Sequence, residues 1–190
     1  MLFLHKGTIF MNFKGKEKMN MSKTKKLTEI AVCIAMAVVC SFIKVWEMPQ
    51  GGSVALTMVP ILFIAHKRGV ASGVVAGAVY GLLSMLIAGV IYHPASILLD
   101  YLLAFGALGI AGAFKNGAKG IVLGSVAGVC GRFLCSLVSG AVLFAEYAPQ
   151  GQNPWVYSLI YQSTYMIPEL IISVAVLLLL YNKARRLFED

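Results

Sequence analysis

Charged residues are scarce in this chain of 190 residues, at 13% of the total, and 8 Asp and Glu face 16 Lys and Arg. Hydrophobic residues make up 59% and the mean hydropathy is +0.82, outside the range of soluble domains. The basic residues lie in short clusters between apolar stretches. This placement argues against a nucleic-acid-binding surface, and the composition predicts a polytopic membrane protein.

The chain also lacks the common motifs of metal and redox sites. Its four cysteines all fall in apolar runs, with no CxxC pair and no Cys/His cluster: Cys33, Cys40, Cys130 and Cys135. Neither a zinc site nor a disulfide framework is indicated. We expect these thiols to be small packing residues, and we expect no metal and no cofactor.

The first 22 residues lack the apolar core and cleavage site of a signal peptide. Four methionines in or near this stretch are possible starts: Met1, Met11, Met19 and Met21. We interpret residues 1–22 as a disordered cytoplasmic extension or a misassigned start. Residues 23–190 are then expected to form one membrane domain.

Apolar segments are the dominant feature of the rest of the chain. Six can be drawn, at residues 27–46, 54–66, 69–91, 95–114, 120–145 and 155–181. Most approach or exceed the roughly 20 residues that span a bilayer as a helix. The second is short and contains Pro60, so we expect it to be tilted, broken or partly interfacial. The predicted fold is an all-α bundle of six transmembrane helices.

The positions of the Lys and Arg residues test this assignment of six helices. If the six helices alternate in direction, fourteen of the 16 basic residues fall on one side of the membrane. The exceptions are Lys44, in the first external loop, and Arg132, within the fifth helix. The positive-inside rule therefore predicts that both termini are cytoplasmic.

Small residues recur at four-residue spacing on two helices. The third carries Gly69, Gly73, Gly77 and Gly81, and the first carries Ala31 and Ala35. Such spacing allows another helix to approach closely. For the glycines it favours packing inside the bundle. For Ala31 and Ala35, internal packing and the docking of a partner both stay open.

Three ionised side chains lie at membrane depth, where they face the bundle interior, a cavity or one another. They are Asp100, Arg132 and Glu169. Counting along the helices places Arg132 and Glu169 near the middle of the membrane, which predicts that they pair. Asp100 lies only about five residues from the external end of the fourth helix, with no basic residue within a turn. Either a distant side chain or a cationic ligand must compensate it.

Aromatic residues gather near the level of Asp100: Trp46, Tyr92, Tyr101, Phe144, Tyr147, Trp155, Tyr157 and Tyr161. They suit an ordinary interfacial belt. They equally suit a pocket that holds an organic cation by cation–π attraction and one counter-charge. The turn-rich loop 47–52 is short enough to fold over such a pocket as a lid.

Five blocks of sequence, in order and at their spacing, resemble the thiamine-specific S-components of energy-coupling factor (ECF) vitamin transporters. They are residues 52–61, residues 67–70, His93-Pro94 with Leu98-Leu99-Asp100-Tyr101, residues 139–151 and residues 156–161. The resemblance covers roughly residues 25–187.

The resemblance implies a six-helix thiamine-binding subunit in a bacterial cell membrane. It further implies that the first helix docks, through Ala31 and Ala35, on a transmembrane coupling protein. That coupling protein carries two ABC-type ATPases, and these partner subunits hydrolyse ATP. Its ligand-binding positions fall on Asp100, Tyr101, Phe144, Tyr157, Ser136 and Gln162. We add Tyr92, Trp46, Arg132 and Glu169 as further candidates. Among these, Trp46 in the first loop is the lid aromatic that the resemblance implies.

The chain departs from the family at two of these positions. Ser136 stands where some members have histidine, and Gln162 where an asparagine is usual. The resemblance implies that both positions contact the pyrimidine half of thiamine. Both replacements retain hydrogen-bonding groups, so the departures bear on preference among thiamine analogues.

Three other functions remain to be weighed. An S-component for a thiamine precursor is the first, although a neutral ligand would leave Asp100 uncompensated. An intramembrane enzyme is remote, because the chain has one intramembrane aspartate, no His-Glu-x-x-His helix and no visible nucleophile–base pair. A standalone secondary transporter normally shows internal repeats, and none is visible.

Overall fold

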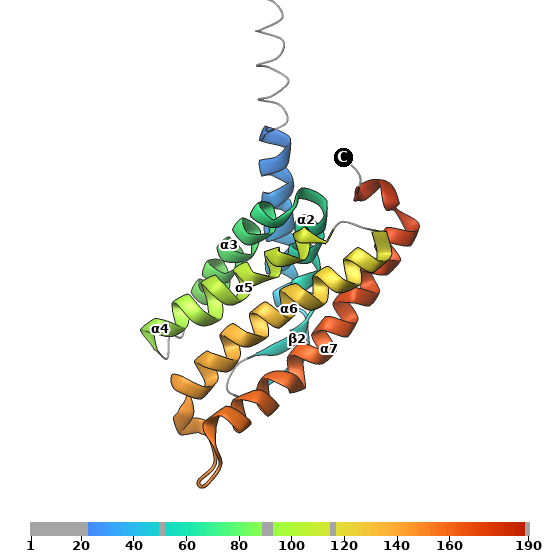
Figure 1. The fold of residues 1–190 in the computed structure, drawn as a ribbon. Helices are drawn as coiled ribbons and strands as arrows, with labels where there is room; N and C mark the ends of the chain where they lie inside the picture. Colours follow the sequence, from blue (N-terminus) through green and yellow to red (C-terminus); the bar gives the residue numbers. More distant parts are fainter. Residues whose placement is uncertain (1–22, 50–51, 89–92, 115–116, 189–190) are drawn as a thin grey trace, which may run out of the picture.

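The residues that the structure describes form six helical segments, as the sequence predicts. The computed structural model describes residues 23–49, 52–88, 93–114 and 117–188 (Figure 1). The helices are residues 23–41, α2 (Met58–Arg68), α3 (Val70–Ala88), a composite helix over residues 94–113, α6 (Gly117–Val142) and α7 (Pro154–Lys183). α3, the composite helix, α6 and α7 are long and apolar enough to cross a membrane. The all-α membrane fold is therefore confirmed.

The composite helix changes its winding along its length. It runs through α4 (Pro94–Ser96), the π-helix η1 (Ile97–Leu103), α5 (Ala104–Ala107) and the 3₁₀ helix η2 (Leu108–Ala113). π-helical turns are rare and are often found at functional sites. The only two polar side chains of η1 are those of Asp100 and Tyr101.

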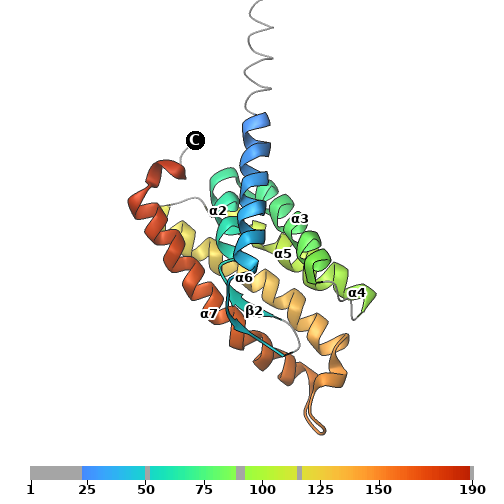
Figure 2. The same ribbon diagram turned by 180° about the vertical axis from the view of Figure 1, so that it is seen from behind.

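The first external loop is a β-hairpin, which the sequence interpretation missed. The strands β1 (Lys44–Glu47) and β2 (Ser53–Ala55) pair antiparallel. The predicted first helix, 27–46, therefore ends five residues early, and the predicted second helix loses its first residues to β2. Apolar runs rich in Val and Trp suit a strand as well as a helix. Figure 2 shows the hairpin beside α7, where Val54 packs with Tyr165 and Met166.

Pro60 neither breaks nor ends α2. It is the third residue of that helix, in the first turn, where a missing N–H breaks no helical hydrogen bond. At its other end α2 stops at Gly69, whose φ of 85° only glycine adopts readily. Gly69 therefore belongs to the turn before α3, rather than to the predicted glycine face of that helix.

The remaining glycines of that face pack inside the bundle, as the favoured interpretation held. A Cβ added to Gly77 would lie 2.0 Å from the carbonyl oxygen of Phe105, and one added to Gly81 would lie 2.2 Å from that of Tyr101. A Cβ on Gly73 would meet the backbone of Gly109 at 2.7 Å. α3 and the composite helix thus approach backbone to backbone.

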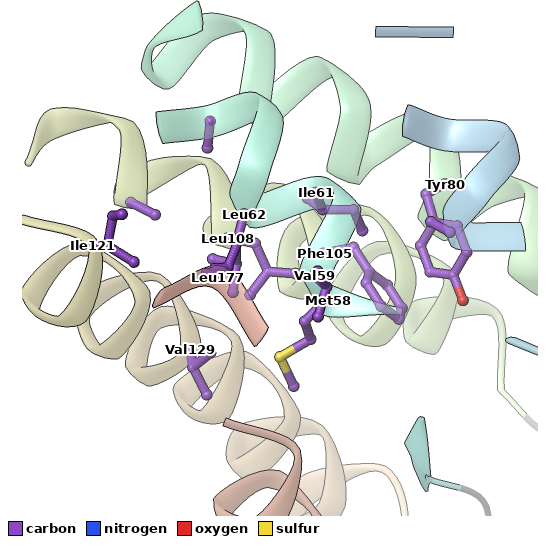
Figure 3. Close-up of a cluster of buried hydrophobic side chains, with 13 residues drawn as sticks. Met58, Val59, Ile61, Leu62, Tyr80, Phe105, Leu108, Ile121, Val129 and Leu177 are labelled. Carbon is purple, nitrogen blue, oxygen red and sulfur yellow. The ribbon is translucent and has the colours of Figure 1, made fainter. Parts of the chain in front are cut away.

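The basic clusters gather at one end of the bundle. Glu29 of the first helix pairs with Lys67 at 3.3 Å and with Arg68 at 2.5 Å, both at the end of α2. Phe188, beyond α7, packs edge-on against Phe63 of α2, with ring centroids 5.0 Å apart. This is the arrangement that the positive-inside argument requires. Near the same end, the apolar core joins α2, η2, α6 and α7, with Ile61, Leu62, Leu108 and Leu177 among its members (Figure 3).

Candidate ligand-binding site

A cavity of about 550 Å³ lies at the other end of the bundle. It is bordered by the last turns of the first helix and α3, by α4 and η1, by α6, by the first turns of α7 and by the hairpin. Residues that line it include Ser41, Lys44, Gly52, Thr57, Tyr80, Ser84, Ser96, Asp100, Tyr101, Phe105, Arg132, Ser136, Phe144, Tyr147, Tyr157, Ser158, Tyr161, Gln162 and Tyr165. Its size suits a small organic ligand.

Asp100 projects from η1 into this cavity. Its Oδ2 accepts a hydrogen bond from the hydroxyl of Ser139 on α6, which is fully buried. No Lys or Arg side chain of the described residues forms an ion pair with Asp100. The carboxylate therefore has a neutral partner on one side and the cavity on the other.

Arg132 and Glu169 form the buried ion pair that the depth count predicts. Arg132 Nη1 lies 3.4 Å from Glu169 Oε2, and the Thr57 hydroxyl donates to Glu169 Oε1 at 2.8 Å. The Arg132 guanidinium also lies over the Phe105 ring, 4.3 Å from its centroid. Arg132 lines the cavity, whereas Glu169 lies behind it and is 1% exposed. The charge of Arg132 is therefore compensated by Glu169 and is not available to Asp100 at contact distance.

Aromatic rings form much of the remaining wall. The ring centroids of Phe144 and Tyr147 lie 6.1 Å apart in the turn that follows α6, and those of Tyr157 and Tyr161 lie 5.9 Å apart on α7. Tyr80 of α3 meets Phe105 edge-on at 4.8 Å. Faces of such rings attract cations and stack on flat heterocycles. All six side chains line the cavity that holds Asp100.

The amide of Gln162 is fixed by its neighbours. Its Nε2 donates to the carbonyl oxygen of Ser136 at 3.1 Å, and its Oε1 accepts from the Tyr165 hydroxyl. Because a backbone carbonyl only accepts, the nitrogen must face α6. The amide retains one N–H and one acceptor lone pair. Such a pair matches the donor–acceptor edge of an aminopyrimidine, as glutamine does with adenine.

The structure brings most of the predicted site residues together in one cavity: Asp100, Tyr101, Phe144, Tyr157, Ser136, Gln162 and Arg132. Trp46 does not line it and is 65% exposed. Tyr92 lies outside the described residues. Ala31 and Ala35 lie exposed on the first helix.

The sequence interpretation missed several lining residues, chiefly Thr57 and Tyr80, together with Ser139 behind Asp100. Tyr80 carried a usable signal, because it is a lone tyrosine in an apolar, glycine-rich helix. Ser139 carried one too, since it continues the polar face of Arg132 and Ser136 at helical spacing. Thr57 gave none, because its importance depends on a residue 112 positions away.

These features define a class: a multi-pass membrane protein with a small-molecule pocket at the end of its helix bundle opposite the basic clusters. Residues 27–189 match the family described as thiamine transporter protein. The chain belongs to that family, and the predicted resemblance is confirmed.

Relatives and solved structures agree. The chain is 39% identical to the thiamine transporter ThiT of Bacillus subtilis (strain 168), over 90% of this chain and 98% of that protein. It is 25% identical to ThiT of Lacticaseibacillus paracasei, over 85% of this chain and 89% of that one. ThiT from Listeria monocytogenes superposes with a TM-score of 0.79 at 25% identity, covering 88% and 98% of the two chains. The S component of a bacterial ECF transporter has the same fold, with a TM-score of 0.63 at 22% identity and coverage of 88% and 99%.

Proposed function

We propose that this protein is the thiamine-binding subunit of an ECF-type importer in the bacterial cell membrane. It captures thiamine from outside and passes it through a coupling module driven by ATP. One observation carries the proposal: Asp100 faces an aromatic-lined cavity of about 550 Å³ without a cationic partner among the described residues. A permanently cationic thiazolium supplies the missing charge.

The two ends of thiamine find matching groups in the cavity. The thiazolium lies by Asp100, and the rings of Tyr101, Phe144 and Tyr157 provide stacking faces. The aminopyrimidine lies by Ser136 and Gln162. The fixed amide of Gln162 offers it one donor and one acceptor. The proposal assigns binding, and no catalysis, to this chain.

Binding of thiamine to the purified protein tests the proposal. Calorimetry should give tight binding of thiamine and weaker binding of its isolated pyrimidine half, which lacks the charge. An absence of heat or of fluorescence change at micromolar thiamine would overturn the assignment. Tighter binding of the neutral pyrimidine half would instead favour the alternative, an S-component for a thiamine precursor.

Partners of this chain would be a transmembrane coupling protein and two ABC-type ATPases. Ala31 and Ala35 support the first helix as the docking surface, because they are exposed at four-residue spacing on it. Ala31→Trp adds bulk to that face, far from the cavity. It should leave thiamine affinity within about twofold of wild type and abolish uptake by cells. Normal uptake by Ala31→Trp would exclude that face as the docking surface.

A further inference from the structure

α6 forms hydrogen bonds with both the carboxylate and the amide that we propose to bind the ligand, Asp100 and Gln162. The Ser139 hydroxyl binds Asp100 of η1, and the Ser136 carbonyl binds Gln162 of α7. Gly140 of α6 allows α6 and α7 to approach closely, since a Cβ at this position would lie 2.3 Å from Ser158 Oγ of α7. The two anchors are three residues apart, or about 4.5 Å along a helix axis. α6 therefore determines how far the carboxylate lies from the amide.

Ser139 acts on the cavity only through Asp100. It is fully buried and is not among the lining residues. An ionised carboxylate only accepts hydrogen bonds, so the Ser139 hydroxyl must donate to Oδ2. This contact engages one carboxylate oxygen and leaves the group free to present its other oxygen to the cavity.

We propose that Ser139 is a positioning residue for ligand charge: it fixes Asp100 at a set distance from Gln162 and so favours cationic ligands of matching length. The proposal rests on the proposed function, because the cation it assigns to Asp100 is the thiazolium of thiamine. It goes further by assigning the recognition of charge to a residue that does not touch the ligand.

Ser139→Ala in the full-length protein tests this role. The two probes are thiamine and its neutral isostere, in which a thiophene replaces the thiazolium. A hydrogen bond to a charged group is worth enough to weaken thiamine binding about tenfold when it is lost. Binding of the neutral isostere should change less than about threefold. The measured quantity is the ratio of the two affinities, from calorimetry.

Ser173→Ala is the matched control. Ser173 on α7 is also fully buried, but its hydroxyl has no hydrogen-bond partner among the residues that the structure describes. The control removes the same atom at the same burial, so the ratio of affinities should stay at the wild-type value. An equal change in both variants would assign the effect of Ser139 to packing and overturn the proposal.

A double-mutant cycle keeps the proposal falsifiable if Ser139→Ala also lowers stability. In an Asp100→Asn background, Ser139→Ala should change thiamine affinity less than about twofold, because the charge it positions is gone. A full tenfold loss in that background would overturn the positioning role. If wild-type protein fails to bind thiamine at all, the proposed function fails first, and that result is distinct from a lost preference for the cation.

Discussion

Two carboxylates of this protein, the half-buried Asp100 and the buried Glu169, differ in how their charge is compensated. Glu169 is 1% exposed and has two protein partners, the guanidinium of Arg132 and the hydroxyl of Thr57. Asp100 has the hydroxyl of Ser139 and an open cavity. The comparison separates a charge that the fold neutralises from a charge that is left for a ligand.

The two carboxylates also differ in the elements that surround them. Glu169 joins the start of α2, the middle of α6 and the middle of α7. Removing either Arg132 or Glu169 leaves the charge of the other buried and unpaired, which affects the fold. Asp100 lies on the π-helical turn η1 at the edge of the cavity. Its removal takes a charge from the ligand site without orphaning another charge.

Glu169→Ala should therefore produce the largest loss of stability. The substitution leaves Arg132 buried without its carboxylate, and breaking a buried pair in this way costs about 3–5 kcal/mol. Reversible unfolding in mixed detergent measures the loss. As a control, Arg132→Met combined with Glu169→Met removes both charges and should recover much of the stability. A single substitution as stable as wild type would mean that the pair contributes nothing to the fold.

Asp100→Asn should have the opposite effect: a large loss of thiamine affinity and no loss of stability. We expect thiamine affinity to fall about 100-fold, or about 2.7 kcal/mol, because Asp100 is the only carboxylate among the described residues that line the cavity. Affinity for the neutral isostere should barely change, and the unfolding midpoint of the ligand-free protein should not fall. Calorimetry and thermal unfolding together test this. An equal loss of affinity for both ligands would mean that Asp100, like Glu169, has a structural role and does not recognise the charge of the ligand.

The Arg132–Glu169 pair was predictable from the sequence because helical depth is simple to count. Each residue rises about 1.5 Å, and alternating helices bring residues of equal depth to one level. The same count put Asp100 near the external end. Helix existence followed from hydropathy in the same way, so the bundle and its charged residues were both predictable.

Trp46 shows where this reasoning failed. Hydropathy does not distinguish an apolar strand from the end of an apolar helix, so the hairpin was missed. The register of β1 is irregular between Lys44 and Trp46, which breaks the two-residue alternation of faces. Lys44 lines the cavity and Trp46 is 65% exposed. Pairing register depends on the partner strand, which no local pattern in β1 reveals.

Thr57→Val should give the smallest effect, and it sharpens the comparison from the side of Glu169. The substitution keeps the shape of the side chain and removes the hydroxyl that donates to Glu169 Oε1. Arg132 still compensates the charge, so stability should fall by only about 1–2 kcal/mol. Thiamine affinity should change little, even though Thr57 lines the cavity, because its proton is already committed to Glu169. Unfolding and calorimetry on one preparation test both parts. A large loss of affinity with unchanged stability would show that the ligand senses Glu169 through Thr57, and the division between the two carboxylates would then be wrong.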